Sequence, residues 1–308
     1  MDQIAQTIII GIANGMIFAL VALGYTLVYG IIELINFAHG EVFMLGSFVA
    51  LVLITTVFKI TAGTPLALMV VQVLLVIAIT MLATATLNVS IERVAYRPLR
   101  NAPKLAPLIS AIGMSFVLQN VALLIFGPAN DGVDRILPNI NVLSIFGIAN
   151  VTISAEQVFV ALVTIPLLLA LSWFVTKTRQ GKAMRATAQD PDTAGLMGVD
   201  VNRTIAITFL IGGALAGAAG VFQGQYLGFV RFDLGFNAGL KAFTAAVLGG
   251  IGNLTGAALG GFLIAFLEVF AAANGQQRWS QAIVFVVLIV VLVFRPAGIL
   301  GQQIGERA

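Results

Sequence analysis

The sequence predicts an all-α polytopic integral membrane protein with about eight membrane-spanning segments. Hydrophobic residues make up 59% of the 308 residues and charged residues only 9%, and the mean hydropathy is +1.04. So few polar side chains cannot cover a soluble globule of this size. Several apolar runs also reach the roughly 20 residues needed to cross a bilayer. We therefore expect residues 1–308 to form a single transmembrane domain, with Gly-broken half-helices, and leave open a two-fold internal pseudo-repeat.

The same composition excludes several classes of site. The chain has no cysteine and a single histidine, His39, so disulfides, thiolate chemistry and H-E-x-x-H metal sites are ruled out. It has no G-x-x-x-x-G-K-[ST] loop, so it is not expected to bind ATP itself. The net charge of +3 comes mostly from loops and does not indicate nucleic acid. We expect no catalytic residue, no metal and no cofactor.

Basic residues are concentrated in two polar loops. Residues 90–104 hold four basic residues against one acidic residue, and residues 177–203 hold five against three. Because cytoplasmic loops carry an excess of Lys and Arg, both loops are expected inside. Residues 127–157 have one basic residue, Arg135, which is typical of a periplasmic loop. The N-terminus is then outside, and it resembles a first span rather than a removable signal peptide.

The expected spans lie between these loops, at residues 7–32, 35–58, 64–89, 105–126, 158–176, 204–230, 242–273 and 282–294. The segment 242–273 is about half again as long as one span needs. A break at its centre predicts two half-helices that meet near the midplane; a continuous helix with a kink is the alternative. If the segment returns to the side it entered, the C-terminus is inside, and if it crosses once, the C-terminus is outside.

Two glycine-interrupted segments are candidates for a substrate path. The first holds Asn36, Phe37, His39, Gly40 and Glu41, where Gly40 permits an unwound backbone. Polar groups at that depth are costly and usually face protein or a water-filled path. His39 lines the path or caps a helix, with the structural role slightly favoured, and Glu41 pairs with His39 or with an arginine of another helix.

The second candidate segment is the break in 242–273, which holds Gly249, Gly250, Gly252 and Asn253. Broken helices in transporters present backbone dipoles to a substrate, and paired broken segments in two halves of a chain are a pointer to the transport site. Glu268, in the apolar run that follows, is assigned no role.

The polar segment 177–203 is predicted to be structured. A helical stretch covers residues 181–189 and breaks at Asp190-Pro191. Asp190 is a good N-cap and Pro191 a good first residue for a short helix over 191–197, which Gly198 ends. This arrangement favours a docking element for a soluble motor; a structured loop without a partner is the alternative.

Four stretches resemble a known family: GYTLVYGIIELINFAHGEVFMLGS (24–47), SIERVAYRPLR (90–100), LISAIGMSFVLQN (108–120) and KAFTAAVLGGIGNLTGAALGG (241–261). They are similar to the permease subunits of bacterial branched-chain amino acid ABC transporters, specifically the H-type (LivH-like) subunit. The resemblance covers nearly the whole chain, and residues 128–157 are its least typical part.

The resemblance implies a subunit of the bacterial inner membrane that pairs with a related M-type permease subunit. Two cytoplasmic ATPase subunits would bind ATP, and a periplasmic binding protein would deliver leucine, isoleucine or valine. It also implies that residues 177–203 dock into the ATPase. The candidate coupling residues are Arg185, Asp190, Asp192, Ala194 and Gly198. Gln189 stands where relatives often have Glu, so no charge is expected there.

Three alternatives remain at this point. Permeases for urea, short amides or other amino acids are similar in sequence, and the chain does not reveal its cargo. A secondary carrier driven by an ion gradient is disfavoured because no carboxylate pair stands within the spans. A scaffold subunit without a conduction path is disfavoured by the polar, glycine-broken segments.

Overall fold

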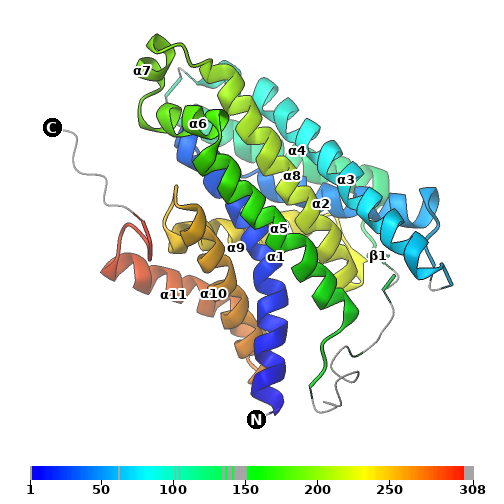
Figure 1. Ribbon diagram of the computed structural model, residues 1–308. Helices are drawn as coiled ribbons and strands as arrows, with labels where there is room; N and C mark the ends of the chain where they lie inside the picture. Colours follow the sequence, from blue (N-terminus) through cyan, green and yellow to red (C-terminus); the bar gives the residue numbers. More distant parts are fainter. Residues whose placement is uncertain are drawn as a thin grey trace.

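The computed structural model describes residues 2–61, 63–100, 102–103, 105–133, 136–137, 141 and 151–301. Across these residues the chain is a bundle of α-helices (Figure 1), and eight of its helical segments are long and apolar enough to cross a membrane. This confirms the predicted all-α polytopic fold. The α-helices are α1 Asp2–Ile32, α2 His39–Val52, α3 Leu66–Ile91, α4 Leu105–Phe126, α5 Ala155–Lys177, α6 Arg179–Gln189, α7 Pro191–Leu196, α8 Val201–Leu227, α9 Leu234–Gly249, α10 Leu254–Ala273 and α11 Ser280–Phe294.

The predicted outer loop 127–157 is described only in part. Within that part, β1 (Asp131–Gly132) pairs antiparallel with β2 (Phe229–Val230), with Asp131 opposite Val230. Residues 134–135, 138–140 and 142–150 of the loop, which include Arg135, lie outside the described chain. The short pairing fixes the start of this segment against the end of α8.

Helices α1, α2 and α8 form the centre of the bundle, and α4, α5 and α11 lie on its outside. More than half of the apolar window of each central helix is buried, whereas less than a quarter of the corresponding window is buried in α4, α5 and α11. The outer helices expose large apolar side chains such as Leu124, Leu169 and Val293. Such an apolar surface is unfavourable in water but favourable against lipid or an apolar face of another subunit.

Small residues allow the central helices to pack at backbone distance. A Cβ added at Gly261 of α10 would lie 2.6 Å from the Ala19 nitrogen of α1. A Cβ added at Gly213 of α8 would lie 2.6 Å from the Thr84 carbonyl oxygen of α3. Both distances are shorter than a Cβ contact allows, so these positions need glycine, as membrane helix interfaces often do.

The predicted break in 242–273 is present between α9 and α10. Gly250 and Gly252 take positive φ angles of 107° and 86°, and the Asn253 side chain caps α10 by accepting from the Gly256 N–H at 3.0 Å. The break lies beside Gly30 of α1 and Met184 of α6, rather than at the middle of the bundle. The break lies near one end of the bundle because the 20 residues of α10 are enough to cross it alone.

This hairpin answers the question left open about the chain's direction. The start of α9 and the end of α10 line one cavity, at the end of the bundle opposite the break. The segment therefore enters and returns at the same end. After α11 the chain reaches the break again, because Ile299 N–H donates to the Leu248 carbonyl at 2.9 Å.

Two local expectations were wrong. Residues 231–241 fell between two expected spans and so in a connecting loop, yet α9 begins at Leu234, where Gly235 and Gly239 pack closely on Gly40. The backbone was expected to unwind at Gly40, but Gly40 is helical and the non-helical stretch is residues 33–38. Gly40 instead provides the close contact, since a Cβ there would lie 2.9 Å from the Gly239 Cα.

Candidate functional site

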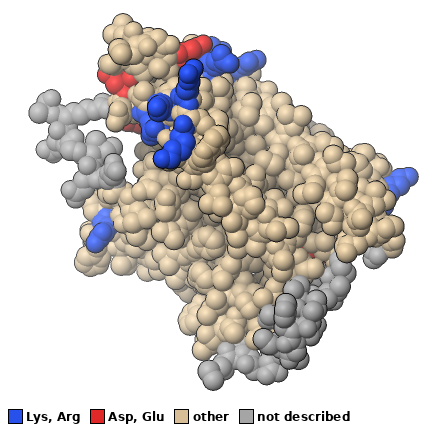
Figure 2. Space-filling model, in the orientation of Figure 1, with Lys and Arg blue, Asp and Glu red and all other residues tan. Residues whose placement is uncertain are grey.

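Helices α6 and α7 form a protruding element at the end of the bundle opposite the N-terminus (Figure 1). The two helices are those that the sequence predicted, within two residues at each boundary. Lys and Arg side chains gather at this end, while uncharged residues cover the middle of the visible face (Figure 2). We call α6 and α7 together the α6–α7 element.

The Asp190 side chain fixes the start of α7. Its Oδ1 accepts from the backbone N–H groups of Asp192 at 3.0 Å and Thr193 at 3.1 Å. Its Oδ2 accepts from the Thr193 hydroxyl at 2.5 Å. A carboxylate at an N-cap satisfies donors that the helix itself leaves unpaired. The six residues of α7 are too few to form a stable helix alone, so the Asp190 cap is what gives α7 a defined conformation.

The tip of α7 exposes two large apolar side chains. Leu196 is 88% exposed and Met197 is 81% exposed, whereas Ala194 is buried. Gly198 follows with a φ of 85°, and the Val199 N–H closes the turn on the Ala194 carbonyl at 3.0 Å. Sequence reasoning missed Leu196 and Met197; the signal was two adjacent large apolar residues directly before the helix-ending glycine.

Arg185 attaches the α6–α7 element to the bundle. Its guanidinium donates to the Val175 carbonyl in the last turn of α5. Gly181 lies against the same turn, where an added Cβ would overlap the Phe174 and Val175 carbonyl oxygens. Arg185 and Gly181 therefore hold α6 against the end of α5.

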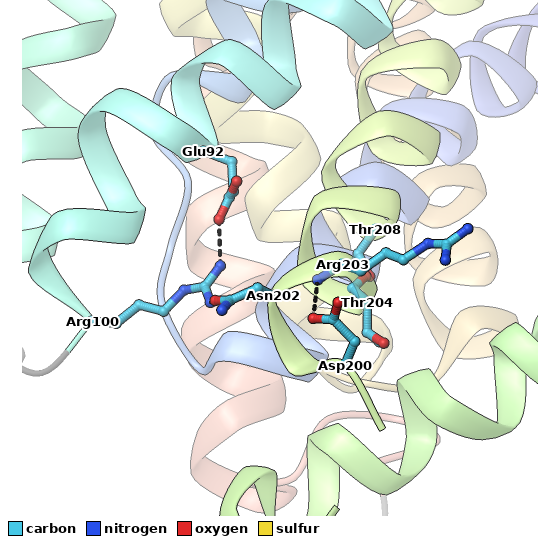
Figure 3. Close-up of polar contacts among 7 residues, drawn as sticks. All are labelled: Glu92, Arg100, Asp200, Asn202, Arg203, Thr204 and Thr208. Carbon is cyan, nitrogen blue, oxygen red and sulfur yellow. Dashed lines mark hydrogen bonds and ion pairs between the residues drawn. The ribbon is translucent and has the colours of Figure 1, made fainter. Parts of the chain in front are cut away.

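An ion pair in the segment that follows α3 contacts the start of α8 (Figure 3). The Arg100 guanidinium contacts the Glu92 carboxylate, which is fully buried, and donates to the Asn202 side-chain oxygen at 2.5 Å. Burial lowers the pKa of Arg100, and the charge of Glu92 opposes that shift. Beside it, Asp200 caps α8 by accepting from the Arg203 N–H at 2.9 Å. Sequence reasoning did not predict this cluster.

The cluster borders a cavity of about 570 Å³ beneath the α6–α7 element. The lining comes from the end of α1 and the 33–38 stretch, from the segment that follows α3, and from the adjoining ends of α6, α7 and α8. It includes Glu33, Arg97, Arg100, Gln189, Asp192 and Asn202. The predicted coupling residue Asp192, on α7, thus lines the same cavity as Arg100.

A second large cavity, of about 650 Å³, opens at the other end of the bundle. We call it the outer cavity. Lys241 of α9 and Glu268 of α10 form an ion pair in its wall, with Nζ and Oε1 2.6 Å apart. The Lys241 ammonium is also 5.9 Å from the centre of the Phe18 ring. Neither charged residue was predicted to have a role.

The predicted path residue Asn36 belongs to a buried network at the α6–α7 end. Its side-chain oxygen accepts from the Tyr96 hydroxyl at 3.0 Å, and its nitrogen donates to Asn88 at 3.4 Å. Asn88 in turn donates to the Phe209 carbonyl of α8 at 2.6 Å. Phe37, next in the chain, lies 6.3 Å from the Phe243 ring.

His39 and Glu41 lie deeper, and both are fully buried. The His39 ring packs edge-on against the Tyr25 ring, with the two ring centres 4.7 Å apart. Within the described chain, neither ring nitrogen of His39 has a hydrogen bond of normal geometry, although the Val21 backbone interacts with the ring. Glu41 accepts from the Ser115 hydroxyl at 3.2 Å. Glu41 therefore pairs with a serine, rather than with His39 or an arginine as expected.

Gly249, Gly250, Gly252 and Asn253 cluster at the α9–α10 break. Gly249 lies against Gly256, and the Asn253 side chain donates to the Leu300 carbonyl at 2.8 Å. None of the nine predicted path residues lines the outer cavity. Gly252 alone of the nine lines a smaller space of about 70 Å³ beside α6. Within the described residues, no group of three potential metal ligands was found.

Comparison of the sequence with known proteins places this chain in a family. A family model described as the permease component of branched-chain amino acid transport systems matches residues 7–292. The high-affinity branched-chain amino acid transport system permease protein BraD of Pseudomonas aeruginosa is 43% identical over 303 residues, covering 98% of this chain and 97% of the relative. The corresponding protein LivH of Escherichia coli is 41% identical over 297 residues, covering 96% and 95%.

More distant relatives extend the comparison. The probable branched-chain amino acid transport permease protein LivH of Methanocaldococcus jannaschii is 30% identical over 297 residues, covering 92% of this chain and 89% of the relative. No solved structure matches. The chain belongs to the family of permease components of branched-chain amino acid transport systems.

Proposed function

We propose that this chain is a transmembrane permease subunit of an ATP-binding cassette importer in the bacterial inner membrane, and that it moves leucine, isoleucine or valine inward. The observation that carries the proposal is the match to branched-chain amino acid permeases over nearly the whole chain. The fold supports it, because the bundle has a large cavity at one end and a protruding, capped helix at the other.

The α6–α7 element is the docking site for the ATPase in this proposal. Leu196 and Met197 would bury their exposed side chains in a groove of the ATPase, because large apolar side chains at a protruding tip gain most from leaving water. The Asp190 cap keeps α7 rigid, and Arg185 connects α6 to α5. Movement of the ATPase would thus tilt the helices of the bundle.

The outer cavity is the entry site for the cargo. It opens at the end of the bundle opposite the basic α6–α7 end, which is the periplasmic end under the positive-inside rule. A periplasmic binding protein would release its ligand there. The buried residues from Asn36 to Glu41 and the α9–α10 break would then form the closed part of the path, which must open as the helices tilt.

The remaining partners follow from the same proposal. Two cytoplasmic ATPase subunits bind the ATP, and this chain holds no cofactor of its own. A related M-type permease subunit supplies the second half of the path. The exposed apolar faces of α4, α5 and α11 are available for that subunit or for lipid.

The test is uptake of labelled leucine by proteoliposomes that hold this chain with its M-type, ATPase and binding-protein partners. The proposal predicts uptake only with ATP inside the vesicles and all partners present. Uptake by this chain alone, driven by a proton or sodium gradient, would support the secondary carrier instead. Uptake of urea or a short amide without leucine uptake would support a different cargo.

A further inference from the structure

The Lys241–Glu268 ion pair is not needed to hold α9 and α10 together. The two helices already pack at backbone distance, since a Cβ at Gly260 of α10 would lie 3.1 Å from the Gly249 nitrogen of α9. The chain also returns through the tight break at Gly250. A structural clamp of two charges would therefore add little to a contact that glycines already make.

Charges at this position carry a cost. The side chains of Lys241 and Glu268 are only 24% and 16% exposed, and both stand on helices within the bundle. Taking a carboxylate and an ammonium out of water is unfavourable, and their mutual attraction offsets that cost only in part. Ionisable side chains among membrane helices usually mark the path of a substrate or ion.

The rest of the outer cavity has two kinds of lining near this pair. Amide side chains of Asn14, Gln223 and Asn237 offer hydrogen bonds, and the rings of Phe18 and Phe43 offer an apolar surface. Its volume of about 650 Å³ lies within the range of small-molecule sites. Such a site fits a ligand with two opposite charges at one end and an apolar group at the other.

We propose that the outer cavity binds the zwitterion of a free amino acid by exchange of ion partners. The Lys241 ammonium takes the α-carboxylate, and the Glu268 carboxylate takes the α-ammonium. No proton moves, and every charge stays paired before, during and after binding. In the empty site Lys241 and Glu268 neutralise each other, so the cavity does not bind a lone cation or anion strongly. This inference rests on the proposed function and names the groups that recognise its cargo.

The exchange also selects against neutral cargo. An amide or urea has no full charge to offer either residue, so opening the Lys241–Glu268 pair would leave two poorly paired charges. Truncating one partner of a buried charge pair costs binding strongly for the same reason. The site therefore favours amino acids over the short amides that related permeases carry.

The test is leucine uptake by the complete transporter carrying the double variant K241M/E268Q, which removes both charges with little change in size. We expect the rate of ATP-dependent uptake to fall by about tenfold or more. Assembly with the ATPase and ATP hydrolysis should be unchanged, because α7 lies at the other end of the bundle. The matched control is R231M/D233N, a second ion pair at the same end that does not line the cavity; its uptake should equal wild type.

Each outcome decides the inference. Normal uptake by K241M/E268Q would overturn it and leave the proposed function intact, whereas no uptake by the wild-type transporter would overturn the proposed function itself. If K241M/E268Q fails to assemble, the single variant E268Q and the charge-keeping variant K241R/E268D replace it. The exchange predicts loss of uptake in E268Q and uptake within about threefold of wild type in K241R/E268D; equal uptake in the two would overturn it.

Discussion

Asp190 and Thr193 are joined by two hydrogen bonds, one from the Thr193 N–H at 3.1 Å and one from its hydroxyl at 2.5 Å. Three residues apart, they close the first turn of α7 and orient the short helix that ends in Leu196 and Met197. The docking surface in the proposed mechanism therefore depends on a single carboxylate.

Removing that carboxylate should loosen α7 without unfolding the bundle. Asp190→Ala loses an N-cap worth about 1 kcal/mol, so local opening of α7 should increase about fivefold. Hydrogen exchange at the Asp192 and Thr193 amides measures this directly. Asp190→Asn is the matched control, because asparagine caps as well as aspartate but carries no charge. Equal protection in Asp190→Ala and wild type would show that the cap does not hold α7.

The Glu92–Arg100 pair should stabilise the junction of α3 with α8. Arg100→Met leaves the Glu92 carboxylate buried without its cation, which should cost about 3 kcal/mol. The double variant E92Q/R100M removes both charges and should recover most of that loss. Melting temperatures of the purified protein in detergent compare the two. A double variant no more stable than Arg100→Met would contradict the pairing.

Close packing of α1 on α10 predicts opposite effects for two glycines. Gly261→Ala should destabilise by about 1–3 kcal/mol, because its Cβ would meet the Ala19 backbone at 2.6 Å. Gly113→Ala in α4 should be neutral or slightly stabilising, since its Cβ would meet nothing within 4 Å. Thermal unfolding of both variants tests the packing. Equal melting temperatures would argue against the α1–α10 contact.

The absence of cysteine from the chain allows its two ends to be placed with single thiols. Two exposed positions at opposite ends of the bundle can each take a cysteine, by Met197→Cys at the end of α7 and by Gln276→Cys after α10. A membrane-impermeant thiol reagent should label Gln276→Cys in intact cells and Met197→Cys in inverted vesicles, with the partner subunits not expressed. The reverse pattern would place α7 in the periplasm.

Local signals in the sequence predicted the α6–α7 element well. The boundaries of α7 depend on Asp190, Pro191 and Gly198, each of which affects only the backbone a few residues away. Their spacing alone therefore indicates where α7 begins and ends. The apolar spans and the break at Gly250 were predicted for the same reason. Each depends on composition over a short window, which a single sequence contains.

The long-range contacts were not predictable in this way. Lys241 and Glu268 are 27 positions apart, and only the α9–α10 hairpin brings them together. The Glu92–Arg100–Asn202 cluster likewise needs α3 and α8 to lie side by side. The break was expected at the middle of the bundle because helix ends were estimated from the apolar run alone, and α9 begins eight residues earlier than that run.

The measurement that tests the account most directly is made on the tip of α7. The variant L196D/M197D should still insert, but the ATPase subunits should no longer co-purify and ATP-dependent leucine uptake should fall to background. The control N274D/Q276D adds the same charge at the opposite end and should behave as wild type. Full ATPase binding and normal uptake in L196D/M197D would contradict the claim that α7 couples this permease to ATP.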